Sequence, residues 1–262
     1  MPVHLELTEY EAGHVAHITI DREAKSNALD WTLLHGLHDT ARNLAGDEQL
    51  RVAVVTGAGD RAFTGGADLN VLSQHTPETA REFITLIHQV NLAFGQLPVP
   101  VICKVNGHCI GAGLELAVSC DLRVSVDTAQ FSMPEVQVGL PSVIEAALLP
   151  RLIGWGRTGE LLYTGLPISA QTALDWGLVE EICPRDELDA TVDTRVQAIL
   201  RAAPLAIRAQ KRLMNEWAAL PLKNAVSRGI DYLSDAYKTK EPAQAIEKLQ
   251  AARRGVHTTN RH

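Results

Sequence analysis

The chain has 262 residues, of which 46% are hydrophobic and 21% are charged, so its composition is that of a globular protein rather than a disordered or collagen-like one. Its 24 lysine and arginine residues stand against 31 aspartate and glutamate residues, which gives a formal net charge of -7. This acidic balance disfavours nucleic acid as the main partner, because binding to phosphates needs clustered basic side chains.

The spacing of apolar residues predicts alternating strands and helices along most of the chain. Buried strands are expected at residues 15–20, 51–56, 100–105, 122–126 and 129–132, and helices at 27–44, 78–97 and 111–120. From about residue 142 onward the pattern is mostly helical. Strands that alternate with helices favour parallel pairing, because parallel neighbours need a crossover connection. We therefore predict the α/β fold class.

The last part of the chain has a different pattern. Between residues 202 and 255 the apolar residues recur at helical spacing, without any strand-like stretch. Such a segment is too thin to bury both of its faces alone, so we interpret it as a docking element. The predicted organisation is a core over residues 1–200 and a helical region over residues 201–262.

The cysteines and the first ten residues indicate the cellular compartment of the protein. Three of the four cysteines, Cys103, Cys109 and Cys120, lie in apolar runs where a free thiol behaves as a small hydrophobic group, so no disulfide framework is expected. Residues 1–10 have the pattern of neither a secretory signal nor a transit peptide, and no apolar run is long enough to span a membrane. We expect a cytoplasmic protein with no membrane partner.

A glycine-containing turn follows the strand predicted at residues 51–56. Gly57 and Gly59 fit a loose dinucleotide-binding pattern. A dinucleotide site needs a helix that begins at those glycines, but Asp60 and Arg61 delay any helix. A simple glycine turn is the favoured interpretation, and a dinucleotide oxidoreductase is the alternative.

Two further segments are rich in small residues and expose backbone amides. The pair Gly65 and Gly66 allows a tight turn with free N–H groups, although a plain surface turn would have the same composition. Residues 111–113 are also small, and they open the helix predicted at 111–120. The unpaired N–H groups and the positive dipole end of that helix would therefore meet at one point.

Two carboxylates stand near these segments. Glu115 lies one turn into the predicted helix among apolar neighbours, where burial would raise its pKa toward the range useful for proton transfer. The alternative is a glutamate that caps the helix or pairs with a base such as Arg123. Glu135 follows 20 residues after Glu115. The two could serve as acid and base on one substrate if the fold brings them together.

The sequence lacks the motifs of several other enzyme classes. His108 and the nearby cysteines are metal-ligand types, but neither a paired C-x-x-C nor an H-E-x-x-H spacing occurs, so no metal site is expected. The sequence contains no G-x-S-x-G elbow and no Walker A loop, which argues against a serine hydrolase and a P-loop NTPase.

Four motifs together carry a family resemblance. They are DREAKSNAL, AFTGGADL, VNGHCIGAGLELAVSCD and FSMPEVQVGLP, and in this order and at these intervals they resemble the enoyl-CoA hydratase/isomerase family, the crotonases. The segment APLAIRAQKRLMNE, which ends at Glu216, is similar to the family's first C-terminal helices. The resemblance implies a spiral of strand-strand-helix turns followed by a helical trimerisation region. It also implies a homotrimer or a homohexamer.

The resemblance assigns roles to individual residues. An acyl-CoA thioester is the implied substrate, with no metal and no cofactor beyond the coenzyme A that belongs to the substrate. The N–H groups of Ala67 and Ala112 would form the oxyanion hole for the thioester oxygen. Glu115 would orient and deprotonate water for attack at C3, and Glu135 would supply the proton at C2. The other implied substrate- and CoA-binding positions are Lys25, Asn27, Ala28, Leu29, Gly66, Asp68, Leu69, Gly111 and Ser142.

Retention of both glutamates favours a 2-enoyl-CoA hydratase. An enoyl-CoA isomerase and an acyl-CoA thioester hydrolase or lyase stay open, because residues 140–148 depart from the glycine-rich stretch of simple hydratases. Within that segment Ser142 falls near the acid position of the family's hydrolases, whereas an N-cap is its plainer interpretation. An RNA-binding member is less favoured, since the net charge is -7 and no lysine-rich helix is present.

Overall fold

The computed structural model describes residues 2–259, so the last three residues of the predicted helical region, 260–262, lie outside the described residues. The chain divides into two compact units, Met1–Ala198 and Ile199–His262. None of the helices within the described residues is long and apolar enough to cross a membrane.

The first unit contains two sheets. The larger has the strand order β1-β2-β3-β5-β7-β10, and the smaller has the order β4-β6-β8-β9. Pairing is antiparallel between β1 and β2 and between β8 and β9, and parallel elsewhere. The strands are β1 (Val3–Tyr10), β2 (Gly13–Ile20), β3 (Leu50–Gly57), β4 (Ala62–Thr64), β5 (Val101–Val105), β6 (His108–Ile110), β7 (Leu122–Val126), β8 (Gln130–Ser132), β9 (Ile168–Ser169) and β10 (Glu181–Cys183).

Helices and irregular loops connect these strands. The α-helices are α1 (Trp31–Ala45), α2 (Leu69–Leu72), α3 (Pro77–Gly95), α4 (Ala112–Ser119), α5 (Leu149–Ile153), α6 (Trp155–Thr164), α7 (Ala170–Trp176), α8 (Leu188–Arg201), α9 (Pro204–Ala219), α10 (Leu222–Ala236) and α11 (Glu241–Thr259). Short 3-10 turns are η1 (Glu23–Lys25), η2 (Pro134–Val138), η3 (Ile144–Leu148) and η4 (Arg185–Glu187).

The chain order generates the expected spiral. Each of the pairs β3–β4, β5–β6 and β7–β8 contributes one strand to the larger sheet and one to the smaller sheet, and a helix or 3-10 turn follows. The strands of successive pairs are neighbours in both sheets, so each turn of the chain extends both sheets by one strand. The connections suit parallel pairing because each return passes through helical segments.

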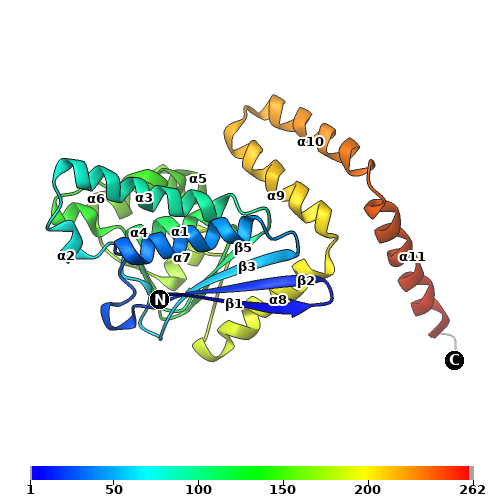
Figure 1. Ribbon diagram of the computed structural model, residues 1–262, viewed down its shortest axis with the longest axis horizontal. Coiled ribbons are helices and arrows are strands. Elements are labelled where there is room, and N and C mark those ends of the chain that lie inside the picture. Colours follow the sequence, from blue (N-terminus) through cyan, green and yellow to red (C-terminus); the bar gives the residue numbers. More distant parts are fainter. Residues whose placement is uncertain (1, 260–262) are drawn as a thin grey trace. The chain divides into compact units, whose positions relative to one another are not determined.

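The core lies around the central strands of the larger sheet. Seven of the eight residues of β3 are buried, as expected for a parallel strand that is covered on both faces. Helices α1 and α3 pack against each other, and α1 contacts β1 and β2 on one face of that sheet (Figure 1). The smaller sheet carries the loops described below.

Near the N-terminus the structure differs from the predicted elements in two places. The first helix begins at Trp31 rather than at residue 27, because Asn27 has a left-handed φ of 56° and the Asp30 side chain accepts a hydrogen bond from Leu33 N as the N-cap. Strand β1 is missing from the predicted elements, because it is an edge strand with most of its residues exposed and lacks a buried apolar run.

The second unit is helical over its described residues, as the sequence predicts. Helices α9 and α10 lie side by side (Figure 1). Polar contacts join them: Trp217 Nε1 donates to Ala225 O at 2.9 Å, and the Glu216 carboxylate accepts hydrogen bonds from Arg228 and Tyr232.

Candidate active site

Three parallel strands of the smaller sheet end at one edge. Strands β4, β6 and β8 are neighbours with the same direction, so their carboxyl ends lie together. Ala67 follows β4, Ala112 follows β6, and Glu135 follows β8. The topology therefore gathers three of the predicted site residues that lie far apart in the sequence.

Two glycines allow the segments after β4 and β6 to approach closely. Gly66 has a φ of 84°, and a Cβ atom on it would lie 2.8 Å from Ile110 O and 3.7 Å from Ala112 N. Gly111 has a φ of 53°, and a Cβ atom there would lie 2.5 Å from Glu135 Oε1. Any side chain at either position would collide with its neighbour and adopt a strained backbone conformation. Both glycines therefore shape the edge where the strands end.

The N–H groups of Ala67 and Ala112 are available at this edge. The bridge between Leu29 and Ala67 uses Leu29 N to Gly66 O at 2.8 Å and Asp68 N to Leu29 O at 2.9 Å, so it leaves the Ala67 N–H unused. Ala112 opens α4, where the first N–H groups have no partner within the helix. Within residues 2–259 neither N–H donates to another protein group. Two free backbone donors can bind an oxyanion.

Glu115 is buried one turn into α4, with 4% of its surface exposed. Ala146 N donates a hydrogen bond to Glu115 Oε1 at 3.3 Å. Burial raises the pKa of Glu115 to about 8, and the negative charges of Glu135 and Glu145 add to this rise, while the Ala146 N–H opposes it. At neutral pH the carboxyl is therefore mostly protonated.

The alternative role weighed for Glu115, a pair with Arg123, is not found among the described residues. The Arg123 guanidinium pairs with Glu180 and donates to Leu178 O at 2.8 Å and to Cys120 O at 2.9 Å. These contacts engage the guanidinium elsewhere. Among residues 2–251, whose side chains the structure describes, Glu115 is thus a buried carboxyl without a cationic partner.

Glu135 lies in η2 and is half-buried. Ser142 Oγ donates a hydrogen bond to Glu135 Oε2 at 2.7 Å, and Oε1 faces Gly111. The plainer interpretation of Ser142, an N-cap, is wrong, because the N-cap residue of η3 is Val143 and no side chain caps that turn. Ser142 instead orients Glu135.

The loop predicted to receive CoA is held together by Asn27. Its buried side chain donates to Ala58 O at 2.9 Å and to Ala62 O at 2.8 Å, and it accepts from Arg22 N at 3.0 Å. These three hydrogen bonds all have partners within the protein, so the Asn27 side chain is engaged in holding the loop. The loop also contains buried Leu29, half-buried Ala28 and exposed Lys25.

Asp68 and Leu69 have opposite environments. Asp68 is buried, and it accepts hydrogen bonds from Arg22 Nη1 at 2.6 Å and from Asn70 N at 2.8 Å. Burial opposes ionisation, but these hydrogen bonds prevail and lower the pKa of Asp68 below its usual value. Leu69, by contrast, is 63% exposed. Asp68 therefore fixes the start of α2, and Leu69 leaves an apolar side chain at the surface.

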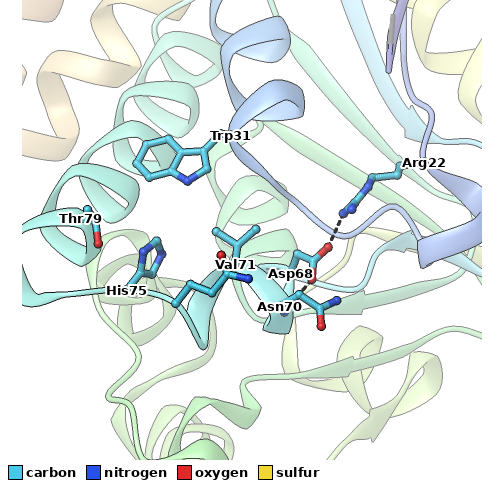
Figure 2. Close-up of a pocket in the computed structure, with 8 residues that line it drawn as sticks. Arg22, Trp31, Asp68, Asn70, Val71, His75 and Thr79 are labelled. Atoms are coloured by element: carbon cyan, nitrogen blue, oxygen red, sulfur yellow. Dashed lines mark hydrogen bonds and ion pairs between the residues drawn. The ribbon is translucent and has the colours of Figure 1, made fainter.

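A cavity of about 350 Å³ lies beside α2 (Figure 2). The Arg22–Asp68 pair forms one part of its wall. The rings of Trp31 and His75 meet edge-on there, with centroids 6.2 Å apart. The complete lining is Arg22, Trp31, Asp68, Asn70, Val71, Gln74, His75 and Thr79. The cavity adjoins the segment that presents the Ala67 N–H, since Asp68 belongs to both.

The glycine turn after β3 is not built for a dinucleotide. Asn106 fills it: its side-chain amide donates to Gly57 O at 2.9 Å and to Gly59 O at 2.7 Å, and its oxygen accepts from Gly57 N at 3.0 Å. Strand β4, not a helix, follows the turn. Without a helix start, these glycines lack the amides that a pyrophosphate needs.

The sequence gives no indication of one cluster of side chains at the site, which His88, Asn91 and Glu145 form. His88 Nδ1 and Asn91 Nδ2 on α3 contact the two carboxylate oxygens of Glu145, at 2.5 and 2.8 Å. From the sequence, Glu145 is only a bulkier residue in the unusual segment 140–148. The partners lie 54 and 57 residues away in the chain, so no local spacing reveals the cluster.

Comparisons with known proteins agree with this architecture. Residues 10–254 match the pattern of the enoyl-CoA hydratase/isomerase family. A short-chain-enoyl-CoA hydratase of Clostridium acetobutylicum is 30% identical over 89% of this chain and 90% of its own, and a carnitinyl-CoA dehydratase of Escherichia coli K12 is 33% identical over 81% of each chain. The crystal structure of an enoyl-CoA hydratase from Bacillus anthracis superposes with a TM-score of 0.91 at 30% identity, covering 96% of this chain and 97% of that one. The predicted fold class is confirmed.

Proposed function

The chain belongs to the enoyl-CoA hydratase/isomerase family, whose members act on acyl-CoA thioesters, and from that premise we propose that it is a 2-enoyl-CoA hydratase. In this reaction water adds across the C2–C3 double bond of the thioester. The observation that carries the proposal is the pair Glu115 and Glu135, two carboxyl groups close enough for the charge of one to raise the pKa of the other.

The first part of the proposed mechanism is an oxyanion hole. The N–H groups of Ala67 and Ala112 would bind the thioester oxygen as negative charge develops on it. One such donor contributes on the order of 3 kcal/mol to transition-state stabilisation. The dipole of α4, which begins at Ala112, adds to the same field. Because the donors belong to the main chain, alanine side chains suffice at both positions.

The second part is proton transfer by the two glutamates. Glu115 would orient and deprotonate the water that attacks C3, and Glu135 would deliver a proton to C2. The pair must then hold one proton in total, which coupled carboxyl groups do over a range of pH. Hydration transfers no electrons, so the proposal requires no redox cofactor, and coenzyme A enters with the substrate.

The raised pKa of Glu115 indicates where that proton resides before substrate binds. It lies mostly on Glu115, whereas Glu135 accepts the Ser142 hydrogen bond. This state is the one that begins the reverse reaction, in which Glu115 protonates the departing hydroxyl group and Glu135 removes the C2 proton. Hydration begins from the state with the proton on Glu135. A catalyst of a reversible reaction must reach both states, so the pair is the functional unit.

The helical second unit suggests how the protein assembles. Its helix α10 exposes an apolar stripe that continues into the next residue: Leu222, Val226, Ile230 and Leu233 on the helix and Tyr237 directly after it are each more than half exposed. These residues recur at helical spacing along one face. We assign this unit, residues 201–262 in the sequence-based division, to oligomerisation into a trimer or hexamer. Light scattering of Ile230→Asp tests it: a smaller particle than the wild type is expected, and an unchanged mass contradicts the assignment.

The proposed reaction is tested by incubating the protein with enoyl-CoA thioesters, from crotonyl to branched and aromatic acyl groups, in water enriched in oxygen-18. Mass spectrometry should find the mass of one labelled water added to at least one ester, and this gain should vanish in Glu115→Gln. A mass-neutral change would identify an isomerase, and free coenzyme A would identify a hydrolase. Either result without labelled product contradicts the hydratase proposal.

A further inference from the structure

The turn before Ala146 has a strained backbone. Ile144, the first residue of η3, has a φ of 39°. A β-branched residue rarely adopts this left-handed conformation, and it persists only where surrounding contacts hold it. The segment therefore needs an anchor.

Glu145 provides that anchor from the next position. Its side chain is 13% exposed, and both carboxylate oxygens are bound by α3: Oε1 by His88 Nδ1 at 2.5 Å and Oε2 by Asn91 Nδ2 at 2.8 Å. His88 and Asn91 stand three positions apart, so they present their polar atoms on one face of the helix. Asn91 is itself 1% exposed, which makes its amide a fixed donor.

The residue after this anchor touches Glu115. Ala146 N shares its hydrogen between Val143 O at 3.0 Å and Glu115 Oε1 at 3.3 Å. A single peptide thus separates the carboxylate that α3 holds from the N–H that contacts the buried glutamate. The ionisable groups that face Glu115 are Glu135 from η2 and Glu145 from η3, and Glu145 is faced in turn by His88 from α3.

We propose that Glu145 is a positioning residue: clamped by His88 and Asn91, it fixes the strained turn so that the Ala146 N–H stays on the Glu115 carboxyl. The inference rests on the proposed function in one respect, because Glu115 matters for turnover only if it transfers protons. The contacts of Glu145 with His88 and Asn91, which we call the clamp, are present in the protein without substrate.

The geometric part is tested without substrate, by hydrogen exchange followed by mass spectrometry. His88→Ala removes one arm of the clamp at a half-exposed site, so it should fold normally. We expect faster exchange of peptides that cover residues 143–148, and His88→Gln, which retains a side-chain N–H donor, should restore slow exchange. Glu82→Gln, an exposed change on the same helix, is the matched control. Unchanged exchange in His88→Ala overturns the proposal.

The kinetic part separates positioning from a merely structural role. In His88→Ala we expect kcat to fall about tenfold with KM little changed, since a displaced N–H misplaces Glu115 rather than the CoA group. In Glu145→Gln the loss of a negative charge should move the pH midpoint that reports Glu115 to lower pH. Unaltered kcat and pH profile in both variants contradict the proposal. If the wild type hydrates no ester, the proposed function fails while hydrogen exchange still decides the clamp.

Discussion

Glu115 and Glu216 show how differently one residue type is used in the two units of the molecule. Burial raises the pKa of Glu115 to about 8, with further contributions from nearby carboxylates. Hydrogen bonds from Arg228 and Tyr232 lower the pKa of Glu216 to about 2. The first carboxyl can gain and lose a proton near neutral pH, and the second stays ionised.

The contrast teaches what each region is built for. Around Glu216 the donors are two complementary side chains, so the ionised form is stabilised and joins α9 to α10. Around Glu115 the neighbours are apolar residues and other carboxylates, so its ionised form is disfavoured in the folded state. Such an arrangement is unfavourable for stability but suits a group that transfers protons.

The largest effect should follow from removing the proton carriers. Glu115→Gln or Glu135→Gln should lower kcat by at least about 10²-fold, as expected when a general acid or base is lost. KM for the CoA ester should change little, because neither side chain is proposed to hold the CoA group. Steady-state kinetics measures both values. Near-wild-type turnover in the two variants would contradict the proposed role of Glu115 and Glu135 in proton transfer.

A similar but smaller loss is expected from Gly66→Ala. The new Cβ would lie 2.8 Å from the backbone oxygen of Ile110, which cannot move as a flexible side chain could. The Ala67 N–H would be displaced rather than removed, so kcat should fall by less than the roughly 10²- to 10³-fold that complete loss of one oxyanion donor costs. Gly154→Ala is the control, because Gly154 also has a positive φ but a Cβ atom on it would meet no described atom within 4 Å. Equal losses of kcat in the two variants would indicate that backbone strain at a positive φ, and not displacement of the Ala67 N–H, causes the effect.

The stability of the protein should report the unfavourable environment of Glu115. The folded state keeps this proton up to about pH 8, whereas the unfolded chain loses it near 4.5, so stability falls as pH rises between these values. Glu115→Gln removes that dependence. Denaturant unfolding should find the variant more stable than the wild type at pH 8.5, by on the order of 4 kcal/mol, and nearly equal at pH 4. A variant that is less stable at pH 8.5 would contradict the assigned pKa.

The smallest effect is expected in the second unit. Arg228→Ala removes the cation that pairs with Glu216, but the pair is partly exposed, so solvent already screens it. We expect a slight fall in the melting temperature of the helical unit and no change in kcat, as followed by circular dichroism and kinetics. The contribution of this pair should be lost progressively as pH falls from about 4.5, the usual glutamate pKa, to about 2, where Glu216 of the folded protein becomes protonated.

Much of the larger sheet can be predicted from the sequence, because its central strands β3, β5 and β7 are mostly apolar and buried. Strands β3, β5 and β7 and helices α3 and α4 lie where the periodicity indicates. The smaller sheet cannot be predicted in full, since β4 and β6 have three residues each and are too short to show a period. Only β8 among its strands is among the predicted elements.

Local motifs indicate most of the candidate site. Glycine pairs and apolar neighbours point to Gly66, Gly111 and Glu115, and these signals are local. The contacts of Asn27 and Glu145 with distant segments are not local, because those partners lie at least 31 residues away in the chain. Nothing in the spacing of such residues specifies which side chains will meet, so the resemblance assigns Asn27 to CoA binding although its side chain holds the loop together.

The most direct test of the role of Glu115 is a titration of glutamate side-chain carboxyl groups by carbon-13 NMR, with the signals of Glu115 and Glu216 identified by substitution. We predict that Glu115 titrates near pH 8, that this midpoint falls in Glu135→Gln, and that Glu216 stays ionised until about pH 2. A Glu115 midpoint at the ordinary value for glutamate, unaffected by Glu135→Gln, would contradict a shared-proton pair and the mechanism built on it.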